Sequence, residues 1–361
     1  MNRPDRNSLR HSGVFLLTIL VGLGLCSCTT SPPKVAANPL GVRISQTNDH
    51  LRVELNGKFF TEYFYSNVPR PFCYPIIGPD GVAMTRNFPM RDVPGEEMDH
   101  PHHRSLWFAH SPVNGVDVWT ERSTSGRIVH RGFADISSGV NTGHIKTRND
   151  WVAPDGKILC SDEETLRFYP CKDNSTITLD FEVTLKATNG DVTFGDSKEG
   201  SFAIRVAESM RVLLPSKKGE PVRPGKGHIV LSTGESDNGA SAAAAKDAKR
   251  EAVTWGKRAA WCDYHGPVDG KLVGFAIMDH PANPRHPTWW HVRDYGLFAA
   301  NPFGQHDFEG LKDKQAGDLK IPAGQSVTFR YRVVIHEGDE KTARIAERYA
   351  EYSAAPLTNI K

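Results

Sequence analysis

Histidine, aspartate and arginine side chains are crowded into residues 99–110, which read DHPHHRSLWFAH. Such groups can exchange protons, hydrogen-bond a hydroxylated or anionic ligand, or coordinate a metal ion. Burying so many polar groups costs free energy unless something satisfies or uses them. This stretch supplies five predictions: His102 and His103 as catalytic acid or base groups, and Asp99, His100 and Arg104 as substrate-binding groups.

A second polar segment, residues 278–304, reads MDHPANPRHPTWWHVRDYGLFAANPFG. It begins as a proline-rich loop, and irregular loops commonly carry function. Alternation along the following strand would place Trp289, His291, Arg293 and Tyr295 on one face. Aromatic rings can cover the apolar face of a sugar while Arg and His hydrogen-bond its oxygens. From this segment we predict five substrate-binding residues: His280, Trp289, His291, Arg293 and Asn301.

A third segment, residues 194–207, reads FGDSKEGSFAIRVA. Glu199 lies at its turn and is predicted to act as a general acid or base, the third catalytic group. Arg205 lies along the strand that follows and is predicted to anchor a carboxylate or hydroxyl group of the substrate.

A metal site is the alternative use of these histidines, with His100, His102, His103 and His291 as candidate ligands. Imidazole suits copper, iron and zinc alike, so the ligand type does not choose among these metals. A strand beginning near His102 would point His102 and His103 to opposite faces, so they could share a ligand only across a bulge or bend. No cofactor is predicted, and a bound metal ion stays an alternative.

The elements that must position these groups are mostly strands. Residues 42–65 alternate apolar and polar side chains and turn at Asn-Asp and Asn-Gly, and residues 156–170 and 175–190 are predicted to form two long paired strands. Helical patterns are confined to residues 241–253 and to the amphipathic residues 340–355. We predict a mainly β fold, a large antiparallel two-sheet sandwich with a C-terminal helix. One domain spans residues 41–340, and a helix and tail span residues 341–361.

The N-terminal residues have the pattern of an export signal. Three arginines precede the apolar run GVFLLTILVGLGL and then LCSC. The pattern around Cys28 resembles a lipobox, which predicts a lipoprotein signal peptide at residues 1–27, lipidation of Cys28 and a polar tether at residues 28–40. The protein is therefore expected in the cell envelope, on the periplasmic or outer-membrane side, touching the membrane only through the lipid.

Charge and cysteine usage narrow the function classes. Without residues 1–27 the chain has 41 basic and 41 acidic residues, and this balance predicts no nucleic-acid partner. No pair of cysteines has CxxC spacing, so a zinc ribbon is excluded. Cys160 and Cys171 either bridge neighbouring strands or remain free thiols.

The three polar segments, together with residues 70–90 (RPFCYPIIGPDGVAMTRNFPM) and 255–266 (WGKRAAWCDYHG), resemble a bacterial family. It is labelled PmoA, or methane oxygenase PmoA, and corresponds to a DUF6807-like domain of unknown function abundant in polysaccharide-degrading bacteria. The resemblance runs collinearly from about residue 40 to 340. Its label implies a metal-dependent oxygenase or hydrolase.

The strand-rich body ending in IPAGQSVTFRYRVVIH is also similar to the galactose-mutarotase-like supersandwich. That resemblance implies a sugar-binding groove lined with His, Arg and carboxylates. Mutarotases pair a His acid with a Glu base late in the chain, and Glu309 is the candidate here.

Our first hypothesis is an exported lipoprotein that binds or processes carbohydrate, or another small polar ligand such as a uronic acid. Its alternatives are the metal-dependent oxygenase or hydrolase and a non-catalytic envelope binding module.

Overall fold

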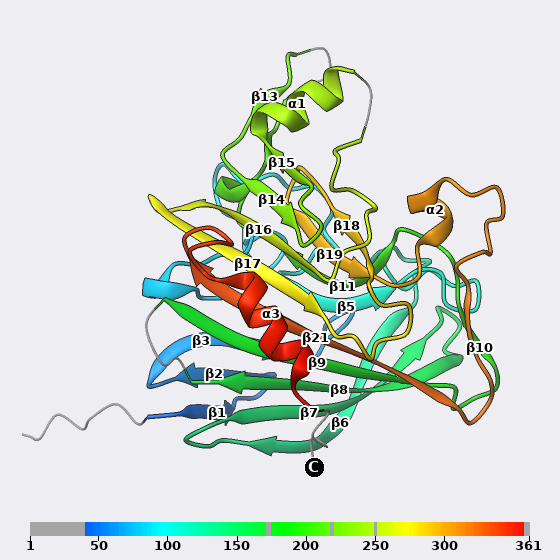
Figure 1. The fold of residues 1–361 in the computed structure, drawn as a ribbon. Helices are drawn as coiled ribbons and strands as arrows, with labels where there is room; N and C mark the ends of the chain where they lie inside the picture. The colour runs from blue at the N-terminus through cyan, green and yellow to red at the C-terminus, as the bar shows by residue number, and fades with distance from the viewer. Residues whose placement is uncertain (1–39, 171–174, 217–219, 249–250, 357–361) are drawn as a thin grey trace, which may run out of the picture. The chain divides into compact units, whose positions relative to one another are not determined.

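The computed structural model describes residues 40–170, 175–216, 220–248 and 251–356. The predicted signal peptide, Cys28 and all of the tether except residue 40 lie outside the described residues. Asn38–Lys361 cluster as one compact unit, which is built mainly of antiparallel strands in two large sheets (Figure 1). The predicted mainly β, two-sheet architecture is confirmed.

One large sheet has eight strands and carries most of the polar segments singled out above. Neighbouring strands pair antiparallel throughout, and β5, β11, β19 and β18 follow one another at one side of the sheet. In spatial order the strands are β1 (Val42–Gln46), β2 (His50–Leu55), β3 (Lys58–Phe64), β4 (Phe72–Tyr74), β5 (Leu106–His110), β11 (Gly200–Arg205), β19 (Leu297–Asn301) and β18 (Trp289–Val292).

The second large sheet has nine strands, and its longest members are 11 or 12 residues long. The predicted pairing of residues 156–170 with 175–190 is confirmed as β8 against β9. In spatial order the strands are β15 (Ser236–Asn238), β14 (His228–Leu231), β16 (Trp261–Val268), β17 (Lys271–Asp279), β21 (Ser326–Glu337), β9 (Thr176–Lys186), β8 (Ile158–Tyr169), β7 (Gly143–Val152) and β6 (Arg127–Ser137).

The core lies between the two sheets. Phe202 of β11 stacks on Phe181 of β9 and on Tyr331 of β21, with ring centroids 4.4 and 5.2 Å apart. On the other strands of the two sheets, Phe60 and Phe168 meet edge to face. Each such buried ring stabilises the fold by roughly 1.5–3 kcal/mol, so this layer fixes how the sheets face each other.

Short elements complete the described chain: β10 (Val192–Phe194) pairs with β20 (Leu319–Ile321), and β12 (Leu213–Leu214) pairs with β13 (Arg223–Pro224). The helical elements are α1 (Gly239–Asp247), α2 (Gln305–Glu309), α3 (Ile345–Ala354) and the 3₁₀ turns η1 (Pro79–Gly81) and η2 (Glu208–Met210).

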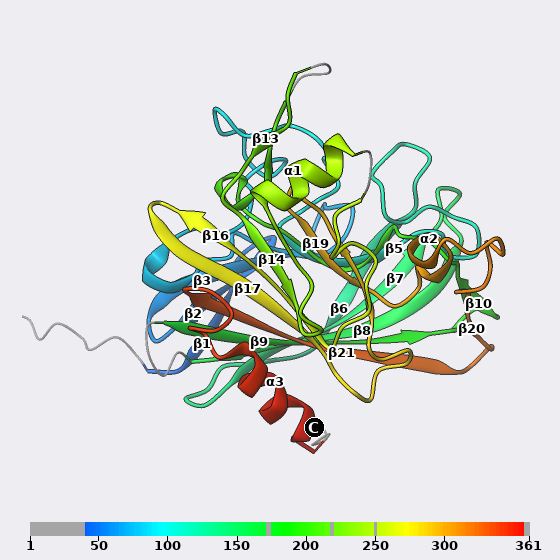
Figure 2. The same ribbon diagram turned by 45° about the horizontal axis from the view of Figure 1, so that its top comes forward.

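The predicted helices are present but shorter than expected. At α1, Asn238 caps the first turn by accepting a hydrogen bond from Ser241 N–H, so the helix begins before residue 241. The C-terminal α3 packs Ile345 and Tyr352 onto the outer face of β16, β17 and β21 (Figure 2). Within the described residues, no helix is long and apolar enough to cross a membrane.

Candidate active site

Four residues on neighbouring strands form one row across the eight-stranded sheet, within the polar cluster. Pairing register aligns Trp107 of β5, Ala203 of β11, Ala299 of β19 and His291 of β18 directly across four strands. Their neighbours along the strands, such as Phe202, face the core, so these four face the opposite side of the sheet. Two alanines leave the sheet low between the Trp107 and His291 rings, whose backbones are roughly 14 Å apart at ordinary strand spacing.

Loops from three distant segments meet at one end of these strands. β5 begins at Leu106, β11 ends at Arg205, and β19 begins at Leu297, opposite Arg205. Because the strands are antiparallel, the loop before β5, the end of β11 and the turn between β18 and β19 share one edge. Residues 99–105, Arg205 and residues 293–296 are therefore brought together.

The backbone around His102 differs from the predicted strand. The strand begins at Leu106, because His100 and Ser105 have left-handed φ angles of 43° and 59° and interrupt extended pairing. The expectation that His102 and His103 point to opposite faces is wrong. Their ring centroids lie 4.5 Å apart, on the same side, and His103 N–H donates to His100 C=O in the turn.

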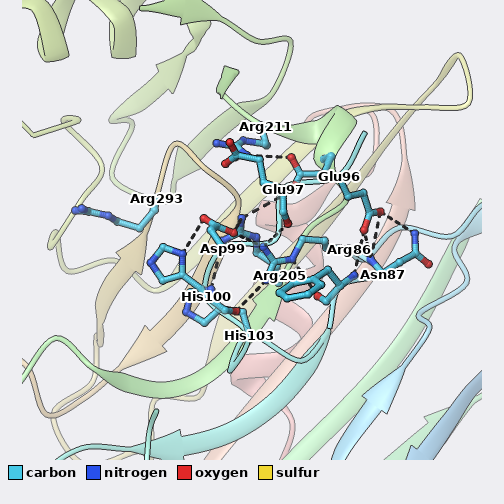
Figure 3. Close-up of polar contacts among 12 residues, drawn as sticks. Arg86, Asn87, Glu96, Glu97, Asp99, His100, His103, Arg205, Arg211 and Arg293 are labelled. Carbon is cyan, nitrogen blue, oxygen red and sulfur yellow. Dashed lines mark hydrogen bonds and ion pairs between the residues drawn. The ribbon is translucent and has the colours of Figure 1, made fainter. Parts of the chain in front are cut away.

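Asp99 is the charged hub of this loop (Figure 3). Its Oδ1 accepts from Arg205 Nη2 at 2.9 Å and also from Arg86 Nη1, and its Oδ2 pairs with His100 Nδ1 at 2.7 Å. Both arginine side chains are fully buried. Burial raises the pKa of Asp99, but the His100 hydrogen bond and the charges of Arg205 and Arg86 outweigh it, so the pKa is lowered.

Aromatic rings form a layered surface beside this hub. His100 lies nearly parallel to His103 and to Tyr295, with centroid distances of 4.7 and 5.1 Å, and His103 and Tyr295 are themselves 6.4 Å apart. His103 in turn stacks over Trp107 at 5.4 Å. The Arg205 guanidinium lies 4.9 Å from the Tyr295 ring centroid, which ties the aromatic layer to the Asp99 hub.

Three imidazoles of this site, those of His102, His103 and His291, have lowered pKa values and are neutral at neutral pH. Burial, then the charges of Arg70 and His100, lower the pKa of His102 to about 3. Burial and the charge of Arg205 lower the pKa of His103, whose Nδ1 faces Arg205 Nη1 at 3.3 Å. Burial, then Arg293 and Lys198, lower the pKa of His291 to about 3. A neutral imidazole offers one donor and one acceptor, which matches a hydroxyl group.

Several buried nitrogens on this face have no hydrogen-bond partner among the described residues. They are Trp107 Nε1, Arg205 Nε and His291 Nδ1, together with Trp119 Nε1 beside His102 and His103. An unmet buried donor costs about 1–3 kcal/mol. Water or a ligand reaching this face would recover that free energy.

Glu199 lies at the rim. It precedes β11, at the opposite end from Arg205, and its carboxylate pairs with Lys198 at 3.4 Å. The side chain is 37% exposed. Its charge contributes to the raised pKa of Tyr295, whose main cause is burial, so Glu199 lies within electrostatic range of the aromatic layer.

Other predicted residues lie apart from the cluster or have structural partners. Arg104 makes two 2.7 Å bonds to Glu121, beside buried Arg70. His280 lies near α3, where its ring meets Tyr352 edge to face. Trp289 shares the face of His291, but its Nε1 donates to Glu309 Oε1 at 3.0 Å, and Asn301 Nδ2 donates to Ser197 C=O.

Sequence reasoning missed Arg86 and Trp107 as members of this site. Arg86 follows Thr85, which bridges to Val206 next to Arg205, so pairing between distant strands places it. Trp107 sits within the noted segment but was not assigned a role. Tyr295 was noted on the predicted strand face, yet β18 ends at Val292, and both Arg293 and Tyr295 lie in the turn that follows.

A hollow of about 220 Å³ opens beside Asp99 and Tyr295. Its other lining residues come from the loops near η2 and β12, and include Glu97, Arg211, Leu213 and Asp294. A larger hollow of about 310 Å³ lies elsewhere, over β6 to β9, and is lined by Lys146, Arg148, Glu163, Glu164 and others. The first hollow reaches the predicted segment at Asp99.

Two of the predicted metal ligands, His100 and His103, stack face to face with their ring centroids 4.7 Å apart. Within the described chain, ligand atoms within 4.8 Å of one another occur in Asp263, His265 and Glu340, outside this cluster. Of the cysteines, Cys160 is a free buried thiol, and Cys171 lies outside the described residues.

The chain belongs to the family of unknown function DUF6807, which matches residues 50–350. No curated protein matches the sequence closely enough to count as a relative.

Several solved structures are distantly similar. A galactose mutarotase-like protein from Clostridium acetobutylicum has a TM-score of 0.36 and 10% identity over 83% of this chain and 99% of its own. A heparan sulfate lyase HepC mutant from Pedobacter heparinus gives 0.35 and 8%, over 84% and 37%. A glycoside hydrolase family 97 enzyme with acarbose from Pseudoalteromonas sp. strain K8 gives 0.30 and 10%, over 82% and 34%. The match thus spans about a third of the length of that hydrolase.

Proposed function

We propose that this protein is an exported lipoprotein that binds or processes carbohydrate at the cluster around Asp99, Arg205 and His291. The observation that carries the proposal is a set of buried nitrogens, Trp107 Nε1, Arg205 Nε and His291 Nδ1, that have no hydrogen-bond partner among the described residues. They lie beside the two alanines of the row from Trp107 to His291. Sugar hydroxyls are the groups that such donors and neutral imidazoles pair with.

The chemistry favours a hydroxylated ligand with an acidic group. Tyr295 and His100 offer flat rings, and Arg293 is 25% exposed, with the exposed Glu251 as its ion-pair partner among the described residues. A guanidinium that is easily released from a surface pair can bind a carboxylate bidentately. We therefore favour a uronic acid over a neutral sugar.

If the protein is an enzyme, Glu199 is the proton acceptor and a histidine the donor. Glu199 is exposed at the rim, where a ligand can reach it. His102 has a pKa of about 3 without ligand and would be too weakly protonated to donate. A bound carboxylate next to this imidazole would raise its pKa, so an anionic substrate supplies the condition that the acid role needs.

The test is a glycan screen with the purified protein, comparing neutral and uronic-acid-containing oligosaccharides. We expect selective binding of acidic glycans. If the protein is an enzyme, at least one of the bound glycans should also be converted to product. Failure of a folded sample to bind any sugar or uronic acid would refute the proposal.

The lipid anchor is part of the same proposal and rests on the sequence around Cys28. Radiolabelled palmitate should be incorporated by the wild-type chain and not by Cys28→Ala, which should leave the membrane fraction. Label that persists in Cys28→Ala would refute lipidation at this cysteine.

A further inference from the structure

A second polar cluster lies on the outer face of the nine-stranded sheet. On β16, Cys262 and Tyr264 face the core, so Asp263 and His265 face outward, towards the segment that leads from β21 into α3. Strand pairing aligns His265 with Gly274 of β17 and Gly274 with His336 of β21. Three strands thus present one row, His265–Gly274–His336, with Asp263 two residues away.

Asp263 joins the two histidines. Its Oδ1 lies 2.7 Å from His265 Nδ1, and its Oδ2 lies 2.7 Å from His336 Nε2. Asp263 and His336 are fully buried, and His265 is 6% exposed. Glu340 completes the group from the other side, with its Oε2 3.8 Å from His265 Nδ1 and its side chain 13% exposed.

Gly274 makes this arrangement possible. A Cβ at this position would lie 2.5 Å from His336 Cε1, 2.6 Å from His336 Nε2 and 2.8 Å from His265 Cβ. Contacts that short force neighbouring groups apart, so only glycine lets the His336 ring lie across β17 and reach Asp263. The glycine in the His265–Gly274–His336 row therefore allows the position of the His336 ring.

We propose that Asp263, His265 and Glu340 form a binding site for a divalent transition-metal ion such as Zn²⁺. Their ligand atoms already lie within 4.8 Å of one another. Zinc bonds to His nitrogen and carboxylate oxygen at about 2.0–2.2 Å, so shifts of roughly an ångström or less would close the set. On binding, the ion would take the lone pair of His265 Nδ1, and the neutral ring would then carry its proton on Nε2.

Charge and orientation agree with a cation at this point. His336 faces acceptors with both ring nitrogens, Nε2 the Asp263 carboxylate and Nδ1 the Glu337 C=O at 3.2 Å. The two carboxylates of Asp263 and Glu340 approach His265 from different sides, and such oxygen and imidazole groups together suit a divalent ion. His336 also fixes the direction of Asp263, as residues behind metal-binding groups commonly do.

Binding would fasten the C-terminal segment to the sheet. Glu340 lies between the end of β21 and the start of α3, whereas Asp263 and His265 lie on β16. An ion held by all three would therefore link the approach to α3 with a central strand. We expect the ion to stabilise the fold, because it binds the folded arrangement and not the separated segments.

The experiment uses the full chain without any histidine tag, stripped of metal and titrated with Zn²⁺ by calorimetry. We expect one Zn²⁺ per chain, a higher melting temperature with Zn²⁺ than with EDTA, and visible ligand-field bands when Co²⁺ replaces Zn²⁺. His265→Gln and Glu340→Gln should each weaken binding at least tenfold.

Glu340→Gln tests metal binding without disturbing the fold. Glu340 is outside hydrogen-bond distance of His265, and its replacement leaves the buried Asp263–His336 pair in place. His286→Gln is the matched control, since His286 Nδ1 pairs with Asp279 Oδ2 at the same 2.7 Å. This control should bind Zn²⁺ like the wild type. Absence of stoichiometric uptake, unchanged uptake in Glu340→Gln, or loss of uptake only in His102→Gln would overturn the proposal.

Discussion

Arg205 donates a hydrogen bond to Asp99 at 2.9 Å, across 106 residues of chain. The same carboxylate oxygen also accepts from Arg86, and both guanidinium groups are fully buried. One partly exposed carboxylate therefore compensates two buried positive charges and fixes the loop that holds His100, His102 and His103.

Replacing Asp99 by Asn should destabilise the protein, because two buried arginines lose their shared counter-charge. We expect a fall in the free energy of unfolding of about 2–4 kcal/mol, measured by urea denaturation. Asp49→Asn is the control, since its partner His50 lies at the surface and Asp49 is 61% exposed. Equal stability of both variants would contradict the role given to Asp99.

Replacing Arg293 and replacing Arg104 should have opposite effects on ligand binding and on stability. Arg293→Ala is expected to weaken ligand binding about tenfold or more with little loss of stability, because Glu251, its ion-pair partner in the described part of the chain, is exposed. Arg104→Ala should lower stability with a small effect on binding, because Arg104 is committed to Glu121. Titration calorimetry and urea denaturation of both variants check this, and the reverse pattern would place the ligand elsewhere.

His291 should make stability depend on pH. Its pKa falls from the ordinary 6.5 to about 3 in the folded chain, so between these values the unfolded chain binds the proton and the folded chain does not. Folding stability then decreases as pH falls from 6.5 towards 3, by up to about 1.4 kcal/mol per pH unit. His291→Gln removes this contribution. The difference in unfolding free energy between wild type and variant should therefore shrink on acidification, and a constant difference from pH 7 to 4.5 would contradict the shift.

Gly274→Ala should destabilise the outer face of the nine-stranded sheet. The added methyl group would displace the His336 ring from Asp263 and leave a buried carboxylate with one partner fewer. A loss of about 1–3 kcal/mol is expected from crowding of this kind. Thermal unfolding measures it, and wild-type stability would show that the His336 position is not fixed by Gly274.

The sequence predicted the fold class because strand alternation and turn residues repeat along nearly the whole chain. It also singled out residues 99–103, Arg205, His291 and Arg293, since unusual density of polar groups is visible in one dimension. Their convergence depends on the order β5–β11–β19–β18, which places strands from residues 106, 200 and 297 side by side. That order follows from how the core packs.

Other features of the structure could not be predicted from local sequence patterns. Left-handed φ angles at His100 and Ser105 reversed the expected facing of His102 and His103. Arg104 has a side chain that could anchor a ligand, but it donates hydrogen bonds to Glu121, 17 residues later in the chain. The Asp263 cluster needed three strands in register and a glycine between two histidines, a relation that only the paired sheet reveals.

Hydrogen exchange with and without a glycan that binds in the screen tests the central claim most directly. The account predicts that peptides covering residues 99–105 and 289–299 gain protection together when the sugar is present. Protection confined to residues 146–165, beneath the hollow over β6 to β9, with no change in the other two segments, would contradict it.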